Sequence, residues 1–237
     1  MWQSLASRLL VGVSLIMGAI SATAAPAEGD WAQLGRFRAA NEALAGSAAA
    51  AAVASQRVVF MGDSITEGWA QADPAFFAHP AHVNRGISGQ TTSQMLVRFR
   101  SDVIELKPRV VVILAGTNDI AGNTGPISEQ TIAGHVASMA ELARVHGIRV
   151  VLVSVLPADR YNWAPTLQPA QRIVMLNRLL QAWAQAHDVT WVDLHSPMAT
   201  STQGLRKEYG EDGVHPNAAG YAVMRPAVER AIAQTLR

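Results

Sequence analysis

The sequence predicts an α/β protein, a three-layer α/β/α sandwich around a flavodoxin-like parallel sheet of about five strands. Short apolar runs rich in β-branched residues alternate with longer segments in which apolar residues recur every three or four positions. The runs are continuously apolar, as expected for strands that helices cover on both faces. A length of 237 residues suits one domain with a sizeable core.

The expected strands begin at residue 58 and are separated by helical segments. Four are strongly apolar, and the second in chain order is weaker. In chain order they are 58–61, 81–87, 110–114, 150–155 and 190–192. In parallel sheets of this kind, ligands bind beyond the carboxyl ends of the strands.

Three helices are expected over residues 128–146, 168–187 and 217–236, because each segment carries an apolar stripe of helical spacing. Gly147 follows the first of them as a C-cap. Ahead of the sheet, apolar residues from Trp31 to Leu44 also recur at helical steps and predict an amphipathic helix. The alanine-rich stretch after it predicts a helix end or linker.

Residues 1–24 are typical of a secretory signal peptide. Arg8 is the only charge before a short apolar stretch, and an Ala-x-Ala pattern ends at Ala24. Cleavage there would leave an N-terminal helical extension over residues 25–56 and a main domain over 57–237. The alternative is an uncleaved membrane anchor, although the apolar stretch is short for a bilayer span of about 20 residues. After cleavage no membrane span is expected, and the protein would be periplasmic or secreted.

The composition excludes several classes of protein. Lys and Arg number 19 against 18 Asp and Glu, so the charge balance does not favour nucleic acid as a partner. The chain has no cysteine, which excludes a lipidated cysteine and means that an exported protein must fold without disulfides.

Four polar segments carry the expected chemistry, and the second in chain order, residues 84–91, contains Gly89. Ser64 lies in Gly62-Asp63-Ser64-Ile65-Thr66, where the first strand breaks into a polar loop. Asn118 lies in a Gly-Thr-Asn-Asp segment after the third strand, and Asp212 precedes His215 by three positions near the C-terminus. Ser64 and Asn118 therefore follow strands whose carboxyl ends share one edge of the sheet.

These residue types suit nucleophilic catalysis on an ester. A serine hydroxyl needs a base within hydrogen-bond reach, and the base needs a third group to orient it. We expect Ser64 to be the nucleophile, His215 the base and Asp212 the orienting carboxylate. The developing oxyanion needs donors, which Asn118 and the backbone N–H groups of Ser64 and Gly89 can supply.

The four segments together resemble the blocks of the SGNH hydrolase superfamily, also called the GDSL family. The second block is Asn84-Arg85-Gly86-Ile87-Ser88-Gly89-Gln90-Thr91, whose glycine corresponds to Gly89. The first block has Ile65 in place of the usual leucine, a core position. The resemblance covers about residues 57–236, and it implies an esterase or lipase without metal or cofactor. The layout is also similar to platelet-activating-factor acetylhydrolase catalytic subunits and to bacterial carbohydrate acetylesterases.

Each site residue also has a purely structural interpretation. Ser64 could cap a helix, and Asn118 could be a turn residue. Asp212 and His215 could form a surface ion pair or hold a metal, although a metal site would need further ligands that are not evident nearby. The aromatic residues Trp69, Tyr161 and Trp163 are candidate substrate-binding residues, or they could simply cover the core.

The sequence thus predicts an exported, cofactor-independent serine esterase. Small acyl esters, O-acetyl groups on carbohydrate above all, are the leading substrate class. A lipid-directed lysophospholipase, acetylhydrolase or thioesterase is the alternative within the enzymes. A non-catalytic binding module is the alternative outside them, although no glycine-rich phosphate-binding motif occurs. The oligomeric state, the acyl-chain length and the leaving group are not predicted.

Overall fold

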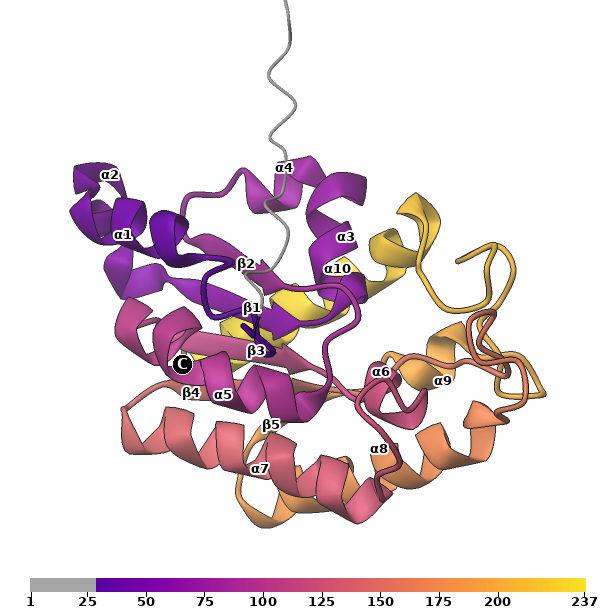
Figure 1. Ribbon diagram of the computed structural model, residues 1–237. Coiled ribbons are helices and arrows are strands. Elements are labelled where there is room, and N and C mark those ends of the chain that lie inside the picture. The colour runs from indigo at the N-terminus through magenta and orange to yellow at the C-terminus, as the bar shows by residue number, and fades with distance from the viewer. Residues whose placement is uncertain (1–28) are drawn as a thin grey trace, which may run out of the picture.

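The computed structural model describes residues 29–237, and the signal-peptide prediction lies outside these residues (Figure 1). Five parallel strands form one sheet in the order β2-β1-β3-β4-β5. The strands are β1 (Val58–Gly62), β2 (His82–Gly86), β3 (Val110–Leu114), β4 (Arg149–Val153) and β5 (Thr190–Val192). This is the flavodoxin-like order, so the predicted fold class is confirmed.

Helices connect the strands and cover the sheet. They are α1 (Arg38–Gly46), α2 (Ala48–Ala52), α3 (Ser64–Ala72), α4 (Pro74–Phe77), α5 (Thr92–Asp102), α6 (Thr117–Ile120), α7 (Glu129–Val145), α8 (Pro169–Ala186), α9 (His195–Met198) and α10 (Ala218–Thr235). Short 3₁₀ turns lie at η1 (Ala54–Gln56) and η2 (Ile104–Leu106). Within residues 29–237, no helix combines the length and apolarity needed to cross a bilayer.

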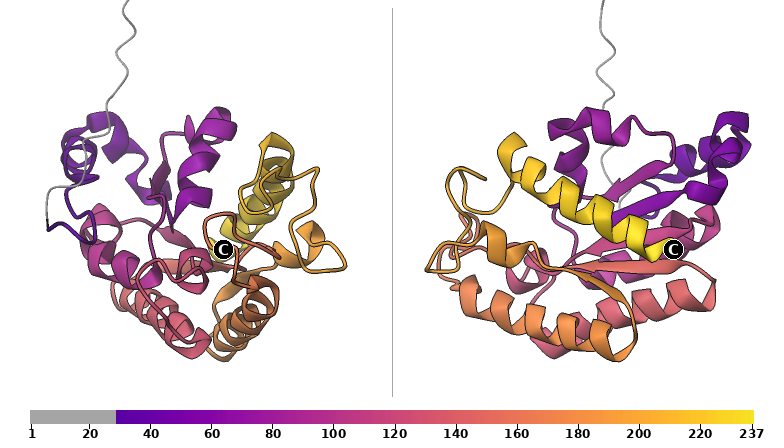
Figure 2. Two further views of the ribbon diagram at one scale, coloured as in Figure 1. Left: turned by 45° about the vertical axis from the view of Figure 1, so that its right-hand side comes forward. Right: turned by 180° about the vertical axis from the view of Figure 1, so that it is seen from behind.

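The sheet separates two apolar cores. Val59 and Met61 of β1 face a core built with α5, α7 and α8, whereas Val58 and Phe60 face a core built with α3, α4 and α10. Figures 1 and 2 show these two layers of helices on opposite faces of the sheet. Because both faces are buried, every position of β1 is apolar or glycine, which explains the continuous apolar run in the sequence.

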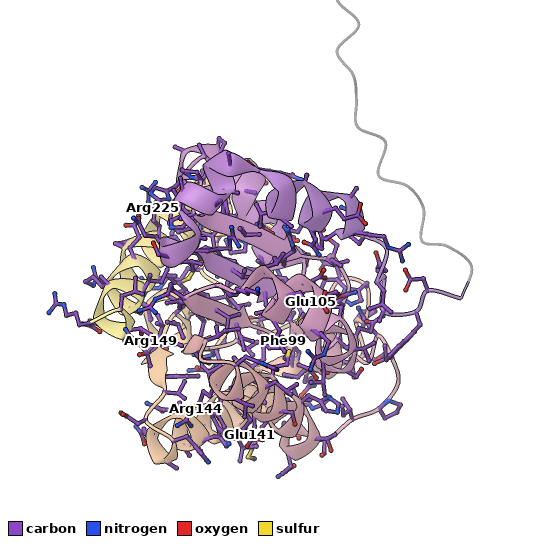
Figure 3. The ribbon with its side chains drawn as sticks, turned by 90° about the vertical axis from the view of Figure 1, so that its left-hand side faces the viewer. Phe99, Glu105, Glu141, Arg144, Arg149 and Arg225 are labelled. Atoms are coloured by element: carbon purple, nitrogen blue, oxygen red, sulfur yellow. The ribbon has the colours of Figure 1, made fainter. Side chains whose placement is uncertain are left out.

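The carboxyl ends of the first three strands are level with one another. Gly62 of β1 pairs with Gly86 of β2 and with Leu114 of β3. The segments that follow these strands, which include Ser64, Gly89 and Asn118, therefore begin at the same edge of the sheet. Figure 3 shows the opposite, amino-terminal side, where Arg149 begins β4.

The N-terminal segment differs from the helix predicted over residues 31–44. A helix is present, but it begins only at Arg38, and residues 30–37 form turns. The carboxylate of Asp30 accepts hydrogen bonds from the backbone N–H groups of Leu34 and Gly35, and Gln33 has a positive φ of 54°. These side-chain bonds replace helical ones, which is why the apolar spacing alone was misleading here.

Candidate active site

Ser64 is held at the start of α3, directly beyond β1. Asp63 caps this helix, because its Oδ1 accepts the N–H of Ile65 at 3.0 Å. The chain of β2 passes very close to the same helix start. A Cβ at Gly86 would lie 2.2 Å from the backbone nitrogen of Glu67, so only glycine fits at this crossing. The position of Ser64 is thus set by main-chain packing.

Ser64, His215 and Asp212 form a continuous hydrogen-bonded chain. Ser64 Oγ lies 2.9 Å from His215 Nε2. The other ring nitrogen, Nδ1, lies 2.6 Å from Asp212 Oδ2. Residues 151 positions apart in the sequence are therefore brought together in the order nucleophile, base and carboxylate.

Asp212 also fixes the loop that carries the histidine. Its Oδ1 accepts the backbone N–H groups of Val214 at 2.9 Å and of His215 at 2.8 Å. Partial burial raises the pKa of Asp212, but the bonds from the His215 ring and the two N–H groups outweigh it, so the pKa lies below its ordinary value. An ionised Asp212 favours the tautomer with the proton on Nδ1, which leaves Nε2 free to accept the proton of Ser64.

The side-chain amide of Asn118 is oriented by two hydrogen bonds. Its Nδ2 donates to the carbonyl of Gln90 at 3.1 Å, and its Oδ1 accepts from Asn123 Nδ2 at 3.1 Å. An amide nitrogen carries two N–H groups, so one remains for a further acceptor. Asn123 Nδ2 also donates to the carbonyl of Gly89 at 3.0 Å, which links Asn118 to the loop after β2.

Two backbone donors complete the arrangement. Within residues 29–237, neither the N–H of Ser64 nor that of Gly89 has a hydrogen-bond acceptor. Gly89 has a φ of 78°, a left-handed conformation that favours glycine, in the turn between β2 and α5. Free donors at the edge of a sheet suit the stabilisation of a negatively charged oxygen.

Two further carboxyl groups are buried beside the site. Asp63 is fully buried, and its Oδ2 has no hydrogen-bond partner in the described part of the chain. Burial raises the pKa of Asp63 to about 7. Burial also raises the pKa of Asp119, although its carboxylate accepts the N–H of Thr92 at 2.9 Å and the Thr92 hydroxyl at 2.5 Å.

The three aromatic candidates lie in different environments. Trp69 is 3% exposed and stacks between Phe76 and Tyr221, so it is a core residue and its proposed contact with substrate is not supported. Tyr161 is also fully buried, and its ring stacks beneath that of Trp163 with centroids 4.9 Å apart. Trp163 is 47% exposed, and its ring centroid lies 6.2 Å from that of His215.

Sequence reasoning missed the residues that hold the loop after β2. Arg98 is fully buried and donates to Gln90 Oε1 at 2.5 Å, to the carbonyl of Gly62 at 3.1 Å and to that of Arg85 at 2.9 Å. It also pairs with Asp102 at 3.1 Å. No motif marks Arg98, and only its unusual place on a buried helix face could have drawn attention to it. Within residues 29–237, no cluster of His, Asp and Glu is arranged to hold a metal ion.

Comparisons with known proteins identify the family of this chain. The model of the GDSL-like lipase/acylhydrolase family matches residues 60–223. The chain belongs to this family. It is a hydrolase of ester bonds, and the predicted family and enzyme class are confirmed.

Two curated proteins are similar in sequence. Esterase TesA of Pseudomonas aeruginosa is 30% identical over 179 residues, which cover 70% of this chain and 82% of that protein. The uncharacterized lipoprotein YqeF of Bacillus subtilis is 37% identical over 83 residues, and the match spans only 34% of either chain.

Solved structures share the fold. A GDSL-like lipase from Bacteroides thetaiotaomicron (BT0569) is 44% identical with a TM-score of 0.81, covering 86% of this chain and 98% of that one. A Streptococcus pneumoniae protein described as a platelet activating factor is 25% identical with a TM-score of 0.67, covering 81% and 88%. A variant of Axe2, an acetyl-xylooligosaccharide esterase from Geobacillus, is 19% identical with a TM-score of 0.58, covering 75% and 94%, and shares the fold alone.

Proposed function

We propose that the protein is an exported serine esterase that removes small acyl groups, O-acetyl groups above all, from carbohydrate. The observation that carries the catalytic part is the hydrogen-bonded chain from Ser64 Oγ through both ring nitrogens of His215 to Asp212. In this proposal Ser64 is the nucleophile, His215 the general base and acid, and Asp212 the orienting carboxylate.

The acylation step follows from this arrangement. Ser64 Oγ attacks the acyl carbonyl carbon as its proton passes to His215 Nε2, and Asp212 stabilises the resulting imidazolium. The carbonyl oxygen becomes negatively charged and receives hydrogen bonds from the N–H groups of Ser64 and Gly89 and from Asn118 Nδ2. When the tetrahedral intermediate collapses, His215 gives its proton to the departing sugar oxygen, and an acyl-Ser64 ester remains.

Deacylation repeats the same steps with water. His215 removes a proton from water, which attacks the acyl carbonyl under the same three donors. The intermediate then expels Ser64 Oγ, which takes the proton back from His215. The products are the free acid and the regenerated enzyme, so the reaction needs no metal or cofactor.

The preference for carbohydrate is supported by Trp163. Its half-exposed ring lies beside His215, on a support of buried Tyr161, and such a ring can stack on the apolar face of a sugar. The structural likeness to the acetyl-xylooligosaccharide esterase Axe2 is in keeping with this substrate class, but it concerns the fold.

Export is the second part of the proposal. It is supported by the charge, apolar stretch and Ala-x-Ala pattern of residues 1–24 and by the partial similarity to a Bacillus subtilis lipoprotein. N-terminal sequencing of the exported protein should find a start at Ala25. A mature protein that still begins with Met1 would contradict the cleavage.

The substrate class is tested with the purified mature protein. We expect hydrolysis of p-nitrophenyl acetate to exceed that of esters with longer acyl chains, and release of acetate from acetylated oligosaccharides. The Ser64→Ala variant is the matched control and should release acetate about 10⁴-fold more slowly, or slower still. Faster turnover of long-chain esters or lysophospholipids than of acetates would favour the lipid-directed alternative.

A further inference from the structure

The segment immediately before α1 lies against the loop that carries Gly89. We call residues 29–37 the N-terminal strap and residues 87–91 the oxyanion loop. Gln90 Nε2 donates to the carbonyl of Ala32 in the strap at 2.8 Å, and Gln94 Nε2 donates to the carbonyl of Trp31 at 2.7 Å. Figure 1 shows the strap in indigo, running in front of the sheet toward the loop between β2 and α5.

Gln90 is a buried link between the strap and the site. It is 1% exposed, and its Oε1 accepts from the buried guanidinium of Arg98 at 2.5 Å. Its backbone carbonyl accepts from Asn118 Nδ2. One residue therefore contacts the strap with its side chain and the Asn118 amide with its main chain.

A second link runs through charged groups. Arg36 of the strap pairs with Glu67 Oε1 at 2.9 Å. The other carboxylate oxygen of Glu67 accepts the backbone N–H of Ser88 at 2.8 Å and also the Ser88 hydroxyl. Ser88 directly precedes Gly89, so this chain of contacts leads from the strap to the free N–H of Gly89.

The charge of Glu67 gives Arg36 an electrostatic role. Burial raises the pKa of Glu67, but the bonds from Ser88 and Arg36 outweigh it and the pKa lies below its ordinary value, so Glu67 is ionised. A carboxylate this close to Gly89 repels an oxyanion that forms at the Gly89 N–H. Arg36 offsets that charge and holds the carboxylate in place for Ser88.

Helix α1, which directly follows the strap, is also anchored near the oxyanion loop. Asn41 of α1 donates to Asp102 Oδ1 at 2.9 Å and accepts from Arg85 Nη2 at 2.6 Å. These contacts join α1 to α5 and β2, on either side of the oxyanion loop. The family model matches residues 60–223, so the strap and α1 lie outside the matched region.

We propose that the N-terminal strap positions the oxyanion loop, with Arg36 as a positioning residue that acts through Glu67 and Ser88 on Gly89. The proposal rests on the oxyanion role assigned to Gly89 under the proposed function. It predicts that the strap affects the chemical step more than substrate binding, because the Gly89 N–H interacts most strongly with the charged oxygen.

The test compares Arg36→Leu with Arg38→Leu in the full mature chain. Arg38 is an exposed arginine two positions away whose side chain makes no hydrogen bond or ion pair within residues 29–237, so its variant is the matched control. We expect Arg36→Leu to lower kcat about tenfold with KM little changed, less than the 10²–10³ typical of losing a donor outright. Arg36→Lys should recover most of the rate, and adding Glu67→Gln to Arg36→Leu should recover part of it.

Three outcomes would overturn the proposal. One is a kcat for Arg36→Leu equal to that of Arg38→Leu, and another is a lower melting temperature with unchanged kcat per folded molecule. The third is a failure of both Arg36→Lys and the double variant to recover activity. If Arg36→Leu does not fold, Arg36→Gln takes its place in the same comparison. If Ser64→Ala hydrolysed the ester at the wild-type rate, the proposed function itself would be refuted. Failure of the strap proposal and failure of the proposed function therefore give different results.

Discussion

Replacement of Asn118 by alanine tests the oxyanion assignment most directly. Asn118 is 4% exposed, and one N–H of its Nδ2 is engaged by the carbonyl of Gln90. The other N–H is the one assigned to the oxyanion. Because that bond strengthens only as the carbonyl oxygen becomes charged, its loss should lower kcat about 10²–10³-fold and change KM little. This corresponds to about 2.7–4 kcal/mol of barrier.

The same substitution also carries a stability cost that can be worked out separately. It leaves the buried carbonyl of Gln90 without its side-chain donor, which costs about 1–3 kcal/mol. For a domain of this size, each kcal/mol lowers the melting temperature by about 2–4 °C. Kinetics at a temperature well below the transition therefore report the catalytic effect on fully folded enzyme.

Asn123→Ala is the matched control. It removes the hydrogen bonds to Gly89 and to Asn118 Oδ1, but it keeps the proposed donor. We expect a smaller loss of thermal stability, because Asn123 is exposed, and a fall in kcat of about tenfold or less. The reasoning would be refuted if Asn118→Ala kept a wild-type kcat, or if the two variants lost kcat equally. A wild-type kcat would remove Asn118 from the site, and equal losses would show that loop support, rather than the Asn118 N–H, sets the rate.

Three further predictions concern other parts of the site. Ser64→Ala and His215→Ala should each lower kcat by about 10⁴-fold or more with an unchanged circular dichroism spectrum, and the double variant should be hardly worse. Asp63 has a folded pKa of about 7 against an ordinary 3.8, so the folded state keeps a proton that the unfolded chain releases, and stability falls as pH rises through this interval. Asp63→Asn keeps the acceptor for Ile65 and should flatten that fall in urea melts between pH 4 and 7, whereas a parallel loss in both proteins would contradict the burial argument. Trp163→Ala should raise KM for acetylated oligosaccharides but not for p-nitrophenyl acetate, and equal effects on both would remove Trp163 from a sugar subsite.

The fold was predictable because its strands are buried on both faces. Such strands are continuously apolar, and the five predicted runs coincide with β1 to β5 within a few residues. The long helices α7, α8 and α10 were equally clear, since each carries one apolar stripe toward a core. The N-terminal helix was placed too early because the Asp30 carboxylate accepts backbone N–H groups and holds turns there, which hydrophobic periodicity does not reveal.

The residues of the hydrogen-bonded chain were predictable for a different reason. Ser64, Asp212 and His215 occur in short segments whose local spacing is chemically informative, and a three-residue step lets Asp212 reach the ring of His215. Trp69 shows the limit of this reasoning. An aromatic residue at this position could bind substrate or pack in the core. Only its stacking with Phe76 and Tyr221 in the structure shows that it is a core residue.

The support of the oxyanion loop could not be predicted, because it depends on contacts between segments far apart in the sequence. Gln90 meets Ala32 at a separation of 58 residues, and Arg36 meets Glu67 at a separation of 31. Neither pair has a spacing that a motif could record, and no motif marks Arg98. A side chain that hydrogen-bonds to a distant main-chain group produces no recognisable pattern in the sequence.

The two halves of the site are therefore held by different means. Ser64 is placed mainly by main-chain features, the level strand ends and a crossing with Gly86 that admits no side chain, together with the cap from the adjacent Asp63. The loop that carries the Gly89 N–H, in contrast, is held by side chains of Arg98 in α5, of Asn123 and of Arg36 in the strap. Relatives that share all four sequence blocks can keep the same nucleophile and base yet differ in these supports. Substitutions in the supports should then change kcat among such enzymes while the distance between Ser64 and His215 stays the same.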